Sequence, residues 1–239
     1  MNINNLNNLN TIIFDLDGVL WNTSTIHDLA FKQTLKELEL TLERSQTLND
    51  FIYTNYAGMS TEEAMILYLK NKKLYPDILS LEQVNKLIKR KRELALDMIK
   101  KDPPLSFGYY ELLSQLALEK KYNLVLASSA SEQSVDYFLK VSKCQPFFKL
   151  VLSSKDVTRA KPDPEIYLTA LKKMQIKNTQ AIVIEDAING IKAAINAGLA
   201  VIAIEGTHSR KELEEAGFKE VPCSFGFEML KNLPTAASQ

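Results

Sequence analysis

The chain has 239 residues with 29 basic and 29 acidic side chains, so its formal net charge is zero. A zero balance gives no sign of a bulk electrostatic partner such as nucleic acid or an anionic membrane. No apolar run reaches the roughly 18 residues of a membrane span, and the start of the chain has neither the basic nor the apolar region of a signal peptide. The two cysteines match no metal-site spacing. We therefore expect a cytoplasmic protein with reduced cysteines.

The stretch Thr11-Ile12-Ile13-Phe14-Asp15-Leu16-Asp17-Gly18 begins the structured part of the chain. Its apolar, mostly β-branched run predicts a strand buried on both faces, with Asp15 and Asp17 at its end. Chemistry in an open parallel sheet collects beyond the carboxyl ends of the strands. Two adjacent carboxylates repel each other unless a cation or a shared proton lies between them. The alternative is an ordinary Asp-Gly turn after a strand.

Residues 23–105 are almost entirely helical in pattern. Ser24 or Thr25 is a candidate cap for a first helix, and a second is predicted near 48–56. Ser60 with Glu63 predicts a capping box at the start of a third. A long helix over 81–100 is predicted to bury Val84, Leu87, Ile88, Leu94 and Ile99, and to expose Lys89 to Arg92 as a basic, solvated face.

The remainder alternates between short apolar runs and helical patterns. Strands are predicted at 123–127, 149–152, 181–184 and 199–204, and helices at 109–120, 132–141, 164–174, 187–197 and 211–216. Such alternation predicts an α/β fold with a doubly wound, Rossmann-like parallel sheet. We expect a core of residues 11–22 and 106–239, an inserted helical cap of residues 23–105 that acts as a lid, and flexible tails at 1–10 and 234–239.

Four predicted strand ends or loops carry polar residues that this topology would bring to one edge. These residues are Asp15 with Asp17, Ser128 with Ser129, Lys161, and Glu185 with Asp186. Each has a structural explanation, as a helix cap, a surface lysine or an acidic helix start. Together, however, carboxylate oxygens suit Mg²⁺, and a lysine with a hydroxyl suits a phosphoryl group. One aspartate can attack phosphorus while a second transfers the proton.

These motifs resemble those of haloacid dehalogenase superfamily phosphotransferases, in the subgroup of beta-phosphoglucomutase and phosphoglycolate phosphatase. The matches are Asp15-Leu16-Asp17-Gly18-Val19-Leu20, Ser128, Lys161-Pro162, and Glu185-Asp186 with Gly190. The resemblance implies that Asp15 is the nucleophile and a Mg²⁺ ligand, and that Asp17 is the general acid/base and binds the metal through its carbonyl. It implies that Ser128, Ser129 and Lys161 bind phosphate, and that Asp186 and Glu185 bind the metal directly or through water.

The chain departs from this subgroup at several positions that bear on substrate. Asn22 stands where an aspartate is usual. Trp21 belongs either to the hinge packing or to the substrate wall, and His27 either to the structure or to the substrate site. After Gly58-Met59-Ser60, Thr61 stands in the place of the mutase arginine. Ala130, Ser131 and Glu132 stand in the place of a short basic and amide stretch of the mutases, and Glu132 would repel phosphate.

These losses favour a Mg²⁺-dependent phosphatase that hydrolyses a small phosphorylated metabolite through an aspartyl-phosphate. A sugar-phosphate mutase and a non-catalytic phosphometabolite-binding protein are the alternatives. We expect no nucleic acid or membrane partner, and a monomer or weak homodimer.

Overall fold

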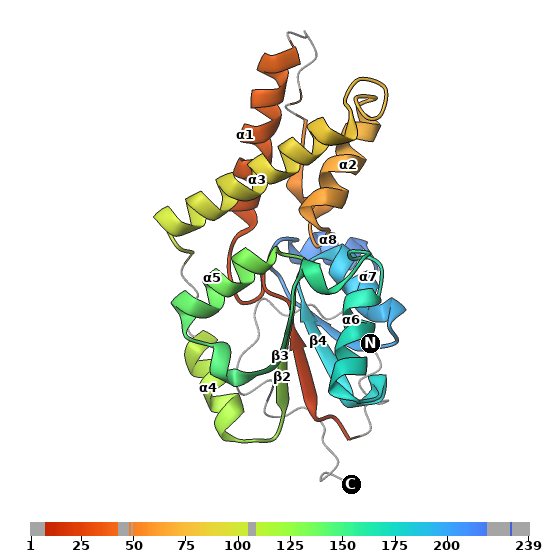
Figure 1. Cartoon of the computed structure of the whole chain (residues 1–239). Coiled ribbons are helices and arrows are strands. Elements are labelled where there is room, and N and C mark those ends of the chain that lie inside the picture. Colours follow the sequence, from red (N-terminus) through yellow and green to blue (C-terminus); the bar gives the residue numbers. More distant parts are fainter. Residues whose placement is uncertain (1–7, 43–47, 49, 105–108, 219–229, 231–239) are drawn as a thin grey trace.

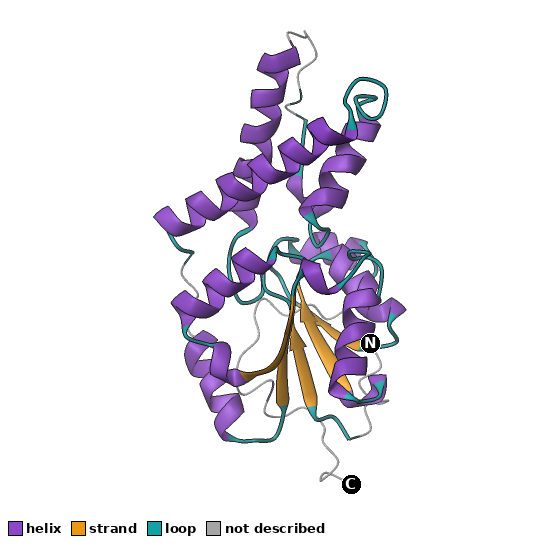
Figure 2. Ribbon diagram, viewed as in Figure 1, coloured by secondary structure: helices purple, strands orange, loops and turns teal. Residues whose placement is uncertain are grey.

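The centre of the molecule is a parallel β-sheet (Figure 2). The computed structural model describes residues 8–42, 48, 50–104, 109–218 and 230. Within these residues five strands pair in the order β3-β2-β1-β4-β5. Their bounds are β1 (Thr11–Phe14), β2 (Asn123–Ala127), β3 (Phe148–Leu152), β4 (Ala181–Glu185) and β5 (Ala200–Ala203). Phe14 aligns with Leu126 on one side and Ile184 on the other, so the carboxyl ends of the central strands share one edge.

Helices cover both faces of this sheet (Figure 1). They are α4 (Tyr109–Leu118), α5 (Glu132–Ser142), α6 (Glu165–Met174), α7 (Ile188–Asn196) and α8 (Arg210–Glu215). Successive strand residues point to opposite faces. Ile12 and Phe14 pack in one apolar cluster with residues of α4 and α5, and Ile13 packs in another with residues of α6 and α7. Three short 3₁₀ turns lie between these elements, at Gln145–Phe147, Ser154–Asp156 and Asn178–Gln180.

A separate group of helices lies over the carboxyl ends of the strands (Figure 1). We call α1 (Ser24–Leu42), the 3₁₀ turn η2 (Tyr53–Tyr56), α2 (Thr61–Asn71) and α3 (Leu81–Lys101) the cap. These elements enclose an apolar cluster of their own, which includes Phe31, Phe51, Met65 and Val84. The indole Nε1 of Trp21, just before α1, donates to the carbonyl of Pro104, just after α3, at 2.7 Å. The cap therefore leaves and rejoins the core at neighbouring points.

Several local predictions for the cap are wrong. The helix predicted over 48–56 is only the 3₁₀ turn Tyr53–Tyr56, and α1 begins at Ser24, so that Ser24 and Thr25 lie in its first turn instead of capping it. The hydroxyl of Ser60 does cap α2 by accepting from the Glu63 amide at 3.2 Å. The carboxylate of Glu63, however, accepts from Ala160 in the core and completes no capping box.

The ends of the chain depart from the prediction at one point. Leu9 is 2% exposed, and Asn10 is bonded to the backbone of Gln180 and Asn123, so the packed core begins two residues earlier than expected. The remaining tail predictions, and Cys223, lie outside the described residues. Cys144 is a buried free thiol. Among the helices that the structure describes, none is both long enough and apolar enough to cross a membrane.

Candidate active site

A buried lysine holds together two of the strand-end carboxylates. Asp15 follows β1, Glu185 ends β4, and Lys161 lies in the loop that precedes α6. The Lys161 Nζ is 2.6 Å from Asp15 Oδ1 and 2.6 Å from Glu185 Oε1. The Tyr167 hydroxyl donates to the same oxygen of Glu185 at 3.2 Å. Residues separated by up to 170 positions thus meet at one edge of the sheet, because parallel strands end there together.

The contacts of Lys161 decide its charge. The side chain is 1% exposed, and burial alone would lower the pKa of its ammonium group. The carboxylates of Asp15 and Glu185 outweigh the effect of burial and hold this pKa well above its usual value. The two ion pairs therefore favour the charged form of Lys161.

The carboxylates outnumber this lysine, and their arrangement fits a divalent cation. Oxygens of Asp15, Glu185 and Asp186 all lie within 4.8 Å of one another. Asp186 Oδ1 is buried and has no hydrogen-bond partner among the described residues. Burial and the neighbouring Glu185 raise the pKa of Asp186 to about 7. A buried carboxylate oxygen with no donor, beside other carboxylates, is what a hard cation such as Mg²⁺ would satisfy.

Two glycines leave space for the Asp186 carboxylate. A Cβ at Gly18 or Gly206 would lie 1.8 Å or 2.5 Å from Asp186 Oδ2, so neither position tolerates a side chain without displacing it. Glu185 is held differently, because its Oε2 accepts from the amides of Asp186 at 2.9 Å and Ala187 at 3.0 Å. Both oxygens of Glu185 are thus occupied. Asp15 and Asp186 are the better candidates for direct ligands.

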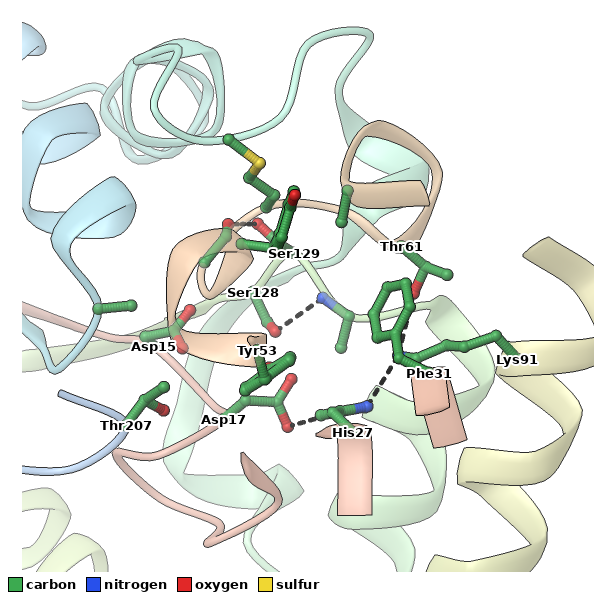
Figure 3. A pocket seen from close by; sticks show the side chains of 16 residues that line it. Asp15, Asp17, His27, Phe31, Tyr53, Thr61, Lys91, Ser128, Ser129 and Thr207 are labelled. Carbon is green, nitrogen blue, oxygen red and sulfur yellow. Dashed lines mark hydrogen bonds and ion pairs between the residues drawn. The ribbon is translucent and has the colours of Figure 1, made fainter. Parts of the chain in front are cut away.

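Asp17 is connected to the cap instead of to Lys161 (Figure 3). Its Oδ1 accepts from the Thr23 hydroxyl, and the His27 Nε2 lies 3.5 Å away. Burial, the largest single influence, raises the pKa of Asp17, but His27, the Thr23 hydrogen bond and Lys91 together outweigh burial, and the pKa falls below its usual value. The two aspartates of the first motif therefore have different neighbours.

The chain of contacts from Asp17 continues through His27 to Lys91, for which the sequence prediction was wrong. We expected Lys91 on a solvated face, but it is 3% exposed, with Nζ 3.0 Å from His27 Nδ1, 3.3 Å from Thr61 Oγ1 and 4.5 Å from the centre of the Phe31 ring. Burial lowers the pKa of Lys91 to about 7. The signal was present in the sequence, because the buried positions of α3 are Val84, Ile88, Lys91, Ala95 and Ile99, at helical spacing.

These groups surround a small cavity between core and cap (Figure 3). It is lined by Asp15, Asp17, His27, Phe31, Tyr53, Tyr56, Gly58, Met59, Thr61, Ala64, Lys91, Ser128, Ser129, Ala130, Ala187 and Thr207. The sequence motifs did not single out Phe31, Tyr53 or Thr207, which carry no recognisable pattern. The cavity volume is about 40 Å³, enough for about three water molecules.

The remaining predicted residues take separate places. The Ser128 hydroxyl accepts from the Ala130 amide at 3.0 Å, while that of Ser129 donates to the Gly58 carbonyl at 2.8 Å. Trp21 is 2% exposed and packs on Phe138, with ring centres 5.3 Å apart, so it belongs to the hinge packing and not to the cavity wall.

Proteins of known family resemble this chain over most of its length. The "phosphorylated carbohydrates phosphatase" of Thermotoga maritima is 24% identical over 87% of this chain and 92% of its own. The beta-phosphoglucomutase of Bacillus subtilis is 26% identical over 82% of this chain and 83% of its own. The crystal structure of beta-phosphoglucomutase from Clostridium difficile has the same fold, with a TM-score of 0.75 and 21% identity over 93% of this chain and 96% of that one.

The family model of the haloacid dehalogenase-like hydrolases matches residues 12–204. That range contains all four motifs and the entire cap. The chain belongs to the haloacid dehalogenase-like hydrolase family.

Proposed function

We propose that the protein is a Mg²⁺-dependent phosphatase that hydrolyses a small phosphomonoester through an aspartyl-phosphate on Asp15. The observation that carries this proposal is the meeting of Asp15, Asp17, Lys161 and the partnerless oxygen of Asp186 at one edge of the sheet. The phosphatase relative in Thermotoga maritima supports the reaction class. The chemistry needs positioning and neutralisation of charge, and these residues supply both.

In the proposed reaction, a carboxylate oxygen of Asp15 attacks phosphorus and the P–O bond to the leaving group breaks. Asp17 gives its proton to the leaving oxygen. A water then attacks the phosphorus of the aspartyl-phosphate, loses its proton to Asp17, and releases inorganic phosphate and free Asp15. The lowered pKa of Asp17 favours its ionised form, which is the form that accepts the proton of the water.

Asp15, Asp186, the backbone carbonyl of Asp17, and Glu185 through water are the proposed groups that hold Mg²⁺. When bound, the cation neutralises negative charge on the phosphoryl oxygens. Lys161 and the Ser128 hydroxyl are placed to orient the phosphoryl group. Ser129 remains a proposed phosphate ligand only if its hydroxyl leaves Gly58.

For substrate, we propose a monophosphate with a polar, uncharged body, such as a phosphorylated carbohydrate. Thr61 lies in the cavity at the position of the mutase arginine, and its hydroxyl is 3.3 Å from Lys91. Glu132 pairs with Lys155. Among the described residues that line the cavity, the cap supplies no arginine, and its one lysine, Lys91, already contacts His27 and Thr61. The mutase relative keeps isomerisation as the second candidate.

The test is a panel of small phosphate esters with Mg²⁺, with EDTA, and with Asp15→Asn. We expect hydrolysis that EDTA abolishes, and a loss of at least ~10³-fold in kcat for Asp15→Asn, since a nucleophile is removed. Asp97→Asn, an exposed acidic position on α3, is the matched control and keeps full activity. Metal-independent hydrolysis, or an active Asp15→Asn, contradicts the proposal. Conversion of one sugar-phosphate isomer into another, primed by a bisphosphate, favours the mutase.

A further inference from the structure

One tyrosine hydroxyl at the active-site cavity has no hydrogen-bond partner among the described residues. Tyr53 belongs to the 3₁₀ turn η2 of the cap, lines the cavity and is partly buried. No residue in the part of the chain that the structure describes bonds to its hydroxyl. Tyrosine hydroxyls inside proteins usually have a partner, because the group both donates and accepts hydrogen bonds. This hydroxyl is therefore available to a ligand.

The other polar side chains that the cap contributes to the cavity already contact protein groups. The Lys91 Nζ is 3.0 Å from His27 Nδ1 and 3.3 Å from Thr61 Oγ1. The hydroxyl of Tyr56, the other tyrosine of the cavity, contacts a side chain of α2. Among the described residues of the cap, Tyr53 is thus the one that offers the cavity an uncommitted polar group.

The ring of Tyr53 is held beside the proposed acid/base of the site (Figure 3). It stacks on His27, with ring centres 6.1 Å apart and ring planes at 24°, and it tilts against Phe31 at 6.5 Å. Burial, followed by the negative charge of Asp17, raises the pKa of the phenol well above its usual value. The hydroxyl is therefore neutral at neutral pH and acts as a hydrogen-bond donor.

The place of this donor decides which part of a substrate it meets. The proposed ligands of the phosphoryl group, Ser128 and Lys161, belong to the core. Asp17, the proposed proton donor to the leaving group, is the carboxylate whose charge acts most strongly on Tyr53. A donor on the cap beside Asp17 thus lies on the leaving-group side of the site. A neutral phenol there suits a neutral oxygen, such as a hydroxyl of a carbon chain.

We propose that Tyr53 is a specificity-determining residue, whose hydroxyl donates a hydrogen bond to an oxygen on the carbon next to the phosphate ester. Within the phosphorylated carbohydrates, the preferred substrates are then those that carry a hydroxyl on that carbon. Phe31 and the ring of Tyr53 supply an apolar wall for the C–H groups of the same chain. The inference rests on the proposed function for the reaction, while ligand binding tests it separately.

Two esters that differ by one hydroxyl test the proposal. Glycerol 3-phosphate carries a hydroxyl on the carbon next to its ester, and propane-1,3-diol monophosphate lacks only that group. Tyr53→Phe keeps the ring and removes the hydroxyl. We expect its kcat/KM to fall roughly 3- to 10-fold for glycerol 3-phosphate, the usual contribution of one hydrogen bond, and to stay unchanged for the other ester. Inhibition by inorganic phosphate, which has no leaving group, is also expected to stay unchanged.

Tyr68→Phe is the matched control. Its hydroxyl also belongs to the cap, but it lies outside the cavity and donates to the Leu48 carbonyl and to Asp50. This variant is expected to keep the wild-type preference between the two esters. Binding of both esters to Asp15→Asn, with and without Tyr53→Phe, is measured by calorimetry in the presence of Mg²⁺. Melting temperatures show that each variant is folded.

An equal loss for both esters, or no loss for either, overturns the role of Tyr53. So does weaker inhibition by inorganic phosphate, because the hydroxyl then contacts the phosphoryl group, and so does a lack of both binding and turnover of glycerol 3-phosphate. If Tyr53→Phe weakens binding of glycerol 3-phosphate alone while no ester on the panel is hydrolysed, the inference stands and the phosphatase proposal fails. If esters are hydrolysed and the preference is unchanged, the reverse holds.

Discussion

Two buried lysines, Lys161 in the core and Lys91 in the cap, face the same site in different electrostatic settings. Lys161 contacts two carboxylates, and its pKa is raised well above the usual value. Lys91 contacts an imidazole, a hydroxyl and an aromatic ring, and burial lowers its pKa to about 7. Burial acts on both in the same direction, so the difference comes from the carboxylates. The core half of the site therefore favours a charged lysine, while the charge of the cap lysine changes near pH 7.

Replacing each lysine by methionine is expected to change the free energy of unfolding in opposite directions, and this is the largest expected difference between the two lysines. Lys161→Met leaves Asp15 and Glu185 buried without their cation and is expected to cost about 3–5 kcal/mol in the free energy of unfolding. Lys91→Met breaks no contact with a carboxylate, and it removes a buried charge. The stability of this variant should therefore equal or exceed that of the wild type near pH 6. Urea unfolding of both variants measures this.

The pH dependence of stability tests the lowered pKa of Lys91 in the cap. The pKa of Lys91 falls from 10.5 in the unfolded chain to about 7 in the native protein. Below pH 7 the native protein therefore carries the full free-energy cost of burying the charged Lys91. This cost disappears as pH rises toward 10.5. The stability advantage of Lys91→Met over the wild type should thus be largest below pH 7, with an upper limit of roughly 5 kcal/mol, and decline above it. If the stability advantage of Lys91→Met grows between pH 7 and 10, the lowered pKa of Lys91 is contradicted.

Gly206→Ala tests the proposed Mg²⁺ ligand Asp186 without changing a charged residue. Its Cβ would lie 2.5 Å from Asp186 Oδ2 and push that carboxylate from its place. We expect Mg²⁺ affinity to fall about 10- to 100-fold, as for loss of groups that orient a metal ligand. Activity and the melting temperature, each followed against Mg²⁺ concentration, provide two measurements. An unchanged Mg²⁺ dependence removes Asp186 from the proposed ligands.

Tyr167→Phe has the smallest expected effect and tests whether Lys161 is the main partner of the Glu185 carboxylate. The variant loses the hydroxyl that donates to the Glu185 carboxylate. This carboxylate still accepts from Lys161 and two backbone amides. We expect a loss of about 1 kcal/mol in the free energy of unfolding. A loss as large as that of Lys161→Met would mean that Tyr167, and not the lysine, satisfies this carboxylate.

The sequence predicts the core better than the cap for a physical reason. Buried strands are short apolar runs whose carboxyl ends must share an edge, so Asp15, Lys161 and Glu185 could be brought together from their order along the chain. The cap carries its chemistry on helix faces, where a charged residue in the buried stripe looks like a solvated one. Lys91 was missed in this way, although its spacing from Ile88 and Ala95 marks it.

Contacts between core and cap could not be predicted from pattern at all. The bonds from Ser129 to Gly58 and from Asn189 to Ala57 end on backbone carbonyls, which every residue has. Glu63 had a good local explanation as half of a capping box, and the tertiary contact with Ala160 replaced it. Such pairs depend on how two packed units meet, which short sequence motifs do not encode.

The hydrogen bond between Trp21 and Pro104 has a consequence for how this protein could be re-engineered. It joins two positions 83 residues apart in the chain, at the two ends of the cap. An insert whose ends lie this close interrupts its host by little more than a short loop would. The core could thus carry a different helical module, or a short linker, at the same junction, and substrate choice could be exchanged as a unit while the chemistry stays with the sheet.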